Sequence, residues 1–113
     1  MSQQSIVDKL GSNLPIKTLV ELARVAETAE LYKDMFEFMS RCSQQKFQES
    51  QDLDVDERNL LSVSIKNIVG VIRASIRTME GLTDEIKEND DSYLNLIKSE
   101  LKQYCQQYIE LLS

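Results

Sequence analysis

Apolar residues recur at intervals of three or four along four stretches of this chain, the spacing that places them on one face of an α-helix. The stretches cover about residues 15–30, 32–47, 54–87 and 92–112. Pro15 stands where the first helix should begin, because a proline in the first turn of a helix sacrifices no hydrogen bond. The pattern therefore predicts an all-α fold, an antiparallel helical bundle of four main helices with one long third helix.

The third helix is the longest predicted element. Asp54 and Glu57 have the spacing of a capping box, in which each side chain accepts a hydrogen bond from the other residue's backbone N–H. The helical apolar spacing then continues through Ile65, Ile68, Ile72, Met79, Leu82 and Ile86. We expect Asn89, Asp90 and Asp91 to break the helix, which would then be a rod of roughly 50 Å at 1.5 Å per residue.

The amino-acid composition excludes several classes of function but adds little to the fold prediction. The 113 residues include 13 Lys and Arg against 19 Asp and Glu, a net charge of −6, and no histidine. This excess of acid disfavours general binding to nucleic acids, since affinity for their phosphates comes from dense Lys and Arg. The lack of histidine excludes His-based acid–base catalysis and imidazole metal ligands. Cys42 and Cys105 are too far apart in sequence for a CxxC pair, so we expect no catalytic residue, metal site or cofactor.

The sequence also has no signal-peptide, membrane-spanning or calcium-binding motif. The N-terminus has no apolar run typical of a signal peptide and no run reaches 18 apolar residues, so we expect a cytoplasmic or nuclear protein that binds no membrane. The alternating acids that follow Asp52 suggest a calcium loop. An EF-hand starting there needs Gly at its sixth position and Glu at its twelfth, where the chain has Glu57 and Val63.

One interval departs from the acidic average. No acid occurs between Glu57 and Glu80, whereas Lys66, Arg73 and Arg77 all lie in that interval. Their spacings of seven and four residues place them along one stripe of a helix. Such a stripe suits a phosphorylated ligand, because an Arg guanidinium binds phosphate oxygens in pairs and Lys adds a point charge. The alternative is that these cations pair with acids of neighbouring helices.

The residues around this interval resemble a known family. Residues 56–70, DERNLLSVSIKNIVG, resemble the signature of the 14-3-3 proteins, adaptors that bind phosphoserine and phosphothreonine. Residues 19–39, LVELARVAETAELYKDMFEFM, are similar to the first two helices of that family. The resemblance extends over about residues 16–113 and accounts for the first four of the family's nine helices. It implies an N-terminal half, with an extension at 1–14 and a 14-3-3-like helical region at 15–113.

The resemblance also implies which residues contact phosphate. The family pocket uses a Lys and an Arg of the third helix, which match Lys66 and Arg73, and Arg77 matches a further basic residue nearby. An Arg–Tyr pair from the fifth helix completes that pocket and has no counterpart in these residues. The expected function is that of a regulatory adaptor for phosphorylated client proteins, with this chain as the dimerisation portion. The alternative is a helical-bundle module that oligomerises without binding phosphopeptides.

The family resemblance further implies a dimer, either a homodimer or a heterodimer with a related chain. In the family, the first helix of one chain contacts the third and fourth helices of its partner, and the matching positions are Val25, Ala26, Ala29, Leu31, Ser75, Tyr93 and Leu96. For Val25 and Ala26, an intrachain core position is the alternative. Leu31 and Leu96 replace the charged partners of Glu100 and Asp34, so two family salt bridges lose one side each. A phosphate on Ser75 would disfavour the dimer contact.

Overall fold

The structure is a computed structural model that describes residues 5–11, 13–82 and 84–112, without the side chains of residues 84–91 and 112. Every regular element in this described part is a helix, so the predicted all-α fold is confirmed. The helices are α1 (Ile6–Lys9), α2 (Ile16–Thr28), α3 (Tyr32–Gln48), α4 (Val55–Glu80) and α5 (Asp84–Leu112). The chain divides into two compact units, Met1–Ser64 and Ile65–Ser113, and each unit is described by itself.

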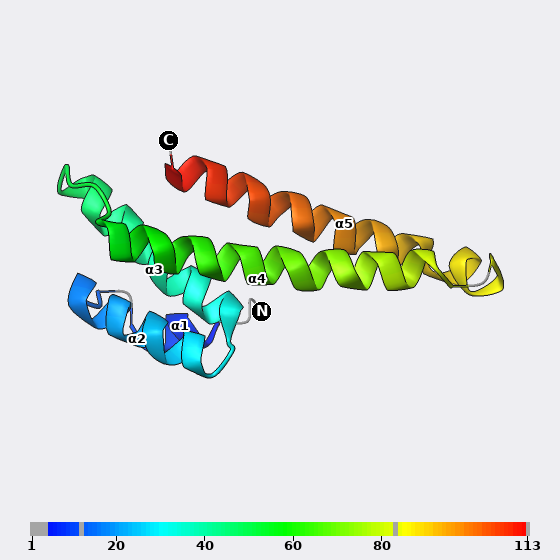
Figure 1. The fold of residues 1–113 in the computed structure, drawn as a ribbon, viewed down its shortest axis with the longest axis horizontal. Coiled ribbons are helices and arrows are strands. Elements are labelled where there is room, and N and C mark those ends of the chain that lie inside the picture. Colours follow the sequence, from blue (N-terminus) through cyan, green and yellow to red (C-terminus); the bar gives the residue numbers. More distant parts are fainter. Residues whose placement is uncertain (1–4, 12, 83, 113) are drawn as a thin grey trace. The chain divides into compact units, whose positions relative to one another are not determined.

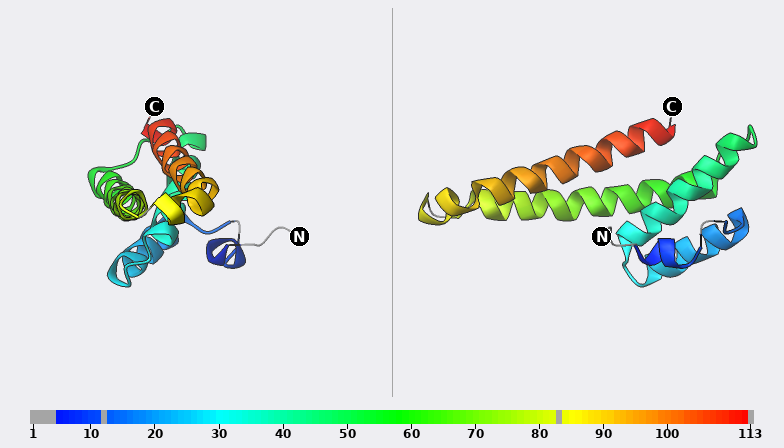
Figure 2. Two further views of the ribbon diagram at one scale, coloured as in Figure 1. Left: turned by 90° about the vertical axis from the view of Figure 1, so that its right-hand side faces the viewer. Right: turned by 180° about the vertical axis from the view of Figure 1, so that it is seen from behind.

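In the first unit, α2 and α3 lie side by side in opposite directions (Figures 1 and 2). The sequence favours this packing because Leu19, Ala23 and Ala26 fall at three- and four-residue intervals and form one buried stripe along α2. Small alanine side chains allow the two helices to approach closely. The facing side of α3 buries larger residues, namely Met35, Phe36, Phe38, Met39 and Cys42. This interleaving of small and large side chains forms the core of the first unit.

Both α2 and α3 end in the same way. Leu31 N–H donates to the carbonyl of Ala26 at 2.8 Å, and Gln51 N–H donates to the carbonyl of Lys46 at 2.7 Å. These six-residue hydrogen bonds are those of Schellman caps, which place one residue in the left-handed region. Glu30 (φ 60°) and Ser50 (φ 57°) occupy these positions. The predicted ends of the first two helices are therefore close to the observed ones.

The start of α4 has the predicted capping box. Asp54 N–H donates to Oε1 of Glu57, and Glu57 N–H donates to Oδ1 of Asp54, each at 2.8 Å. Two of the backbone donors that a helix leaves free at its N-terminus are satisfied in this way. After the cap, the buried side chains keep the predicted helical spacing and include Leu60, Leu61, Ser64, Ile65, Ile68 and Ile72.

The predicted end of the third helix is wrong. The helix α4 ends at Glu80, and α5 begins at Asp84 and runs without a break through residues 89–91. Gly81 N–H donates to the carbonyls of Arg77 and Thr78, and the chain turns there. Glycine is about 1 kcal/mol less favourable than Ala inside a helix, but Gly70 lies within α4, so a glycine does not by itself end this helix. The polar residues 89–91 do not end a helix either. At 26 residues, α4 is about 39 Å long. The side chain of Ile86, assigned to the third helix, lies outside the described residues.

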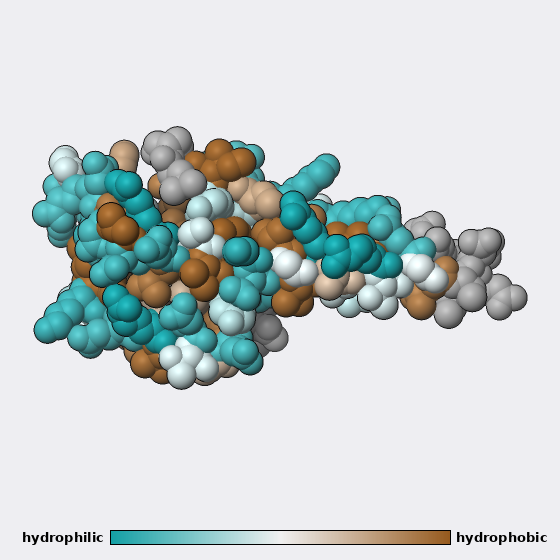
Figure 3. Space-filling view, viewed as in Figure 1, coloured by the Kyte–Doolittle hydropathy of each residue, from teal (hydrophilic) through white to brown (hydrophobic). Residues whose placement is uncertain are grey.

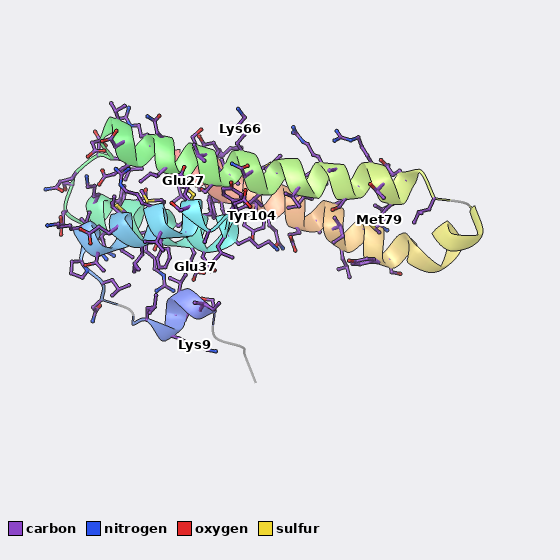
Figure 4. All side chains as sticks on the ribbon, turned by 60° about the horizontal axis from the view of Figure 1, so that its bottom comes forward. Lys9, Glu27, Glu37, Lys66, Met79 and Tyr104 are labelled. Atoms are coloured by element: carbon purple, nitrogen blue, oxygen red, sulfur yellow. The ribbon has the colours of Figure 1, made fainter. Side chains whose placement is uncertain are left out.

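The N-terminal segment, residues 5–11 and 13–15, folds against α3 within the first unit (Figures 1 and 4). Ser5 caps α1 by accepting a hydrogen bond from Asp8 N–H at 3.0 Å. Val7 is completely buried. Ser5 Oγ also donates to Glu37 at 3.0 Å, and Arg41 forms ion pairs with Asp8 and Glu37. The first four residues and residue 12 of the predicted 1–14 extension lie outside the described part.

In the second unit, α5 runs back alongside the C-terminal part of α4 (Figures 1 and 2). Lys98 of α5 forms an ion pair with Glu80 of α4 at 3.4 Å. The apolar side of α5 is only partly shielded from water, and no side chain between residues 92 and 111 is fully buried. Its half-buried members are Leu94, Ile97, Leu101, Tyr104, Cys105, Tyr108 and Leu111.

The helix α4 meets the length and composition of a membrane span, with an 18-residue window of mean hydropathy 1.2. One third of that window is buried within the chain. Its buried apolar residues, Leu61, Ile65, Ile68 and Ile72 among them, lie at helical spacing, while Lys66 and Arg73 are exposed, a distribution typical of an amphipathic core helix. A single helix of this kind is weak support for membrane insertion.

Candidate functional site

The three predicted phosphate-binding residues are all exposed on α4. At 100° per residue they fall within about 40° of one another and roughly 130° around the helix from the buried stripe of Ile65, Ile68 and Ile72. Figure 4 shows Lys66 projecting away from α4. Along the helix axis, Lys66 and Arg73 are about 10 Å apart, and Arg73 and Arg77 about 6 Å apart. The predicted stripe is therefore present as one exposed basic surface, which we call the basic stripe (Lys66, Arg73 and Arg77).

The basic stripe has no ion pair within the part of the chain that the structure describes. The acids that bound the interval have other partners. Glu57 accepts hydrogen bonds from Asp54 N–H and Lys46, and Glu80 pairs with Lys98. Among the described residues, the alternative that these cations serve as structural ion pairs therefore finds no support.

Two charges of the basic stripe repel each other, although Arg77 also lies in the last turn of α4, where the helix dipole favours a cation. Like charges four residues apart, such as Arg73 and Arg77, destabilise a helix by about 0.2–0.5 kcal/mol. No described side chain offsets this repulsion. A bound anion would offset the repulsion, since guanidinium groups form paired, charge-assisted hydrogen bonds with phosphate or carboxylate oxygens. What the stripe can do chemically is therefore to bind an anion from solution.

The predicted dimer residues differ in exposure. In the first unit, Val25 is 64% and Leu31 54% exposed, and Ala29 is also exposed, whereas Ala26 is 4% exposed and belongs to the core. In the second unit, Tyr93 is 58% and Leu96 68% exposed. Ser75 is likewise exposed. Apolar patches also reach the molecular face shown in Figure 3, among hydrophilic side chains.

A buried polar cluster in the first unit was not predicted as such from the sequence. Lys46 of α3 forms an ion pair with Glu57 of α4, and Cys42 Sγ lies 3.8 Å from the same carboxylate. The hydrogen bond that Lys46 donates to Glu57 raises the pKa of Lys46. Burial, together with the charge of Glu57, raises the pKa of the Cys42 thiol to about 12. The thiol is therefore protonated at neutral pH and a poor nucleophile.

Among the described residues, neither a metal-binding group nor the polar hollow of the first unit includes a residue of the basic stripe. No group of His, Cys, Asp and Glu among the described residues could hold a metal ion. A polar hollow of about 570 Å³ lies in the first unit between the N-terminal segment and α3, with Asp8, Arg41 and Gln45 in its wall. The predicted phosphate-binding residues do not line it.

Comparison with known proteins gives the same assignment along most of the chain. The family model described as 14-3-3 protein matches residues 22–113. A 14-3-3-like protein from Pisum sativum is 38% identical over an alignment of 110 residues that covers 90% of this chain and 42% of the relative. A 14-3-3-like protein A from Vicia faba is 38% identical over an alignment of 106 residues that covers 87% of this chain and 40% of the relative. The chain thus spans about two fifths of the length of these relatives.

Proposed function

The chain belongs to the 14-3-3 protein family, and from this premise we propose that it is the N-terminal portion of a phosphoserine- and phosphothreonine-binding adaptor. Lys66 and Arg73 contact the phosphate of a client protein, and Arg77 adds positive charge beside them. The activity is binding, by which the adaptor masks, bridges or reshapes its clients, and no catalytic residue takes part. Such clients are met in the cytoplasm and the nucleus.

One observation carries this proposal. In an acidic chain, three exposed cations lie on one side of α4 and none has an ion pair among the described residues. Arg and Lys are the side chains that bind phosphate most readily, and a rigid helix holds them at constant spacing. The family resemblance supplies an Arg–Tyr pair from a fifth helix for the other side of the phosphate. We therefore expect this chain alone to bind phosphopeptides weakly, and a longer form to bind them tightly.

Dimerisation is the second part of the proposal. Val25, Leu31, Tyr93 and Leu96 are each more than half exposed, and burial of their apolar surface against a second chain would stabilise a dimer. Ala29 and Ser75 lie at the same contact. Ala26 is part of the core of the first unit and supports the exposed Val25 at the proposed dimer contact.

Fluorescence polarisation tests the proposal directly. A labelled peptide with one phosphoserine, and its unphosphorylated counterpart, are titrated with this chain and with any longer form of the protein. We expect binding that requires the phosphate and that is lost in Lys66→Glu and Arg73→Glu variants. Lys17→Glu reverses the charge of an exposed lysine on α2 and serves as the matched control. Equal binding of both peptides, or no binding by the long form, would reject the adaptor function.

The alternative function is a helical module that oligomerises without binding phosphopeptides. The exposed apolar residues on α2 and α5 favour it, because they require only a partner chain. A dimer in sedimentation experiments combined with no phosphopeptide binding by any form would support this alternative.

A further inference from the structure

The positive charge of Arg77 is not needed to neutralise a single phosphate group. A phosphoserine carries a charge of about −1.5 to −2 at pH 7, and Lys66 and Arg73 together supply +2. Arg77 then remains as an exposed cation beside a neutralised site. We infer that Arg77 forms a second anion subsite, so that the preferred ligand combines a phosphorylated residue with a carboxylate three or four residues away. This inference rests on the proposed function of Lys66 and Arg73.

The spacing follows from helix and peptide geometry. A phosphate held between Lys66 and Arg73 lies about 11 Å from Arg77 along the axis of α4, at 1.5 Å per residue. An extended peptide advances about 3.3 Å per residue. A ligand that runs along α4 in this conformation therefore brings the third or fourth residue from its phosphate opposite Arg77.

The neighbours of Arg77 on α4 leave its charge available. Residues three and four positions away on a helix are those within reach, and for Arg77 they are Arg73, Ala74, Glu80 and Gly81. Glu80 could neutralise Arg77 from this position. Its carboxylate instead accepts a hydrogen bond from Lys98 of α5 at 3.4 Å. Lys98 thus acts as a positioning residue that keeps the nearest acid on α4 occupied.

A peptide scan measures the second subsite. The probes are a labelled phosphoserine peptide with otherwise neutral residues and a set in which one Asp is placed two to five residues from the phosphoserine on either side. Exposed charge pairs are weak, so we expect about a threefold gain in affinity, limited to three or four residues on one side. In Arg77→Ala the ratio between the affinities for the Asp peptide and for the neutral peptide should fall to about one, whatever affinity the neutral peptide itself loses. Arg58→Ala removes another exposed arginine of α4 and should leave the gain unchanged.

Lys98→Ala provides an independent arm. Without Lys98, Glu80 is free to pair with Arg77, so the preference for Asp should shrink while binding of the neutral phosphopeptide is retained. Binding of the neutral peptide without any gain from Asp, or a gain that persists in Arg77→Ala, would overturn the second subsite alone. A failure of every phosphopeptide to bind would overturn the proposed function together with it.

Discussion

The ammonium of Lys46 is hydrogen-bonded to the carboxylate of Glu57, and both side chains are largely buried. This ion pair joins α3 to the first turn of α4. Glu57 also accepts the backbone N–H of Asp54 in the capping box, so one carboxylate serves both the helix start and the contact between helices.

Removal of one partner should be costly. In Lys46→Ala, the carboxylate of Glu57 remains buried without its counter-charge, and we expect a loss of about 3 kcal/mol in the free energy of unfolding. Urea denaturation followed by circular dichroism measures the loss. Lys17→Ala removes an exposed lysine and should change stability by less than about 0.5 kcal/mol. Equal effects of the two variants would contradict a stabilising role for the ion pair.

Alkaline pH should destabilise the first unit. The Cys42 thiol has a pKa near its ordinary value of 9 in the unfolded chain and about 12 in the folded chain, and the pKa of Lys46 is likewise raised on folding. A group with a raised pKa contributes stability below its unfolded pKa and loses it as the pH rises through the folded value. We therefore expect stability to fall from about pH 9 upward, where the thiol begins to ionise in the unfolded chain.

A variant separates the thiol from the other titrating groups. Cys42→Ala lowers stability at every pH because it leaves a cavity, but its stability should fall less steeply above pH 9. Cys105→Ala, at a half-buried position on α5, should keep the steep fall of the parent chain. Parallel pH profiles for all three proteins would show that Cys42 is not the group responsible.

The N-terminal segment should detach from α3 without unfolding the rest. Arg41→Ala removes the ion pairs with Asp8 and Glu37, and Val7→Asp places a charge in a fully buried position. We expect faster amide hydrogen exchange and faster proteolysis within residues 5–15 in both variants. Exposed Lys9 offers the control substitution Lys9→Ala.

Acid should have the same effect on this segment. Hydrogen bonds from Ser5 and Arg41 hold the pKa of the Asp8 carboxyl below its usual range. The contact between Asp8 and Arg41 therefore has its full strength above the ordinary pKa of an Asp. It weakens as the pH falls below about 4, because Asp8 then becomes protonated. A segment that exchanges at the same rate at pH 6 and pH 3, after correction for intrinsic rates, would contradict this.

Glycine at the end of α2 should stabilise the protein. Glu30 holds a positive φ of 60°, a conformation that costs a residue with a Cβ roughly 1–2 kcal/mol and costs glycine little. Part of this gain is lost to the greater freedom of glycine in the unfolded chain. We expect Glu30→Gly to raise the free energy of unfolding by about 0.5–1 kcal/mol. Glu21→Gly, an exposed substitution inside α2, should instead lower it by a similar amount.

The proposed dimer should respond to charge at its apolar positions. Leu31→Asp and Leu96→Asp each place a carboxylate where we propose contact with a second chain, and both side chains are more than half exposed in the single chain. We expect each variant to weaken the dimer at least tenfold in sedimentation experiments while the helical content is retained. Phe47→Asp changes an even more exposed apolar residue, at 78%, outside the proposed contact and should leave the dimer intact.

The parts of the fold that depend on local chemistry could be predicted from the sequence. The capping box of Asp54 and Glu57 uses residues three positions apart, and the apolar spacing from Leu60 to Ile72 identifies the buried side of α4. The end of α4 was mispredicted because the apolar spacing continues across Gly81 into the next helix. Gly70 lies inside the same helix, so the presence of a glycine did not by itself identify the end of α4.

Contacts between residues far apart in the sequence could not be predicted in the same way. The burial of Val7 against α3 depends on a short helix that has no periodic pattern of its own. Similarly, the capping box identified Glu57 from the sequence, but its ion pair with Lys46 depends on the contact between α3 and the start of α4. The basic stripe was visible in the sequence because its cations lie on one helix, whereas the pairing of Glu80 with Lys98 requires the turn at Gly81.

The partial burial of α5 has a consequence for how this protein can change over evolutionary time. Between residues 92 and 111 the apolar side chains each keep some contact with water, so exchanging one for another leaves a smaller cavity than in a closed core. Met35 and Met39 on α3 are completely enclosed, and a change of volume there must be absorbed by tightly packed neighbours. Substitutions along α5 therefore cost little folding stability. The surface of α5 can change to fit a new partner without any change in the core of the first unit.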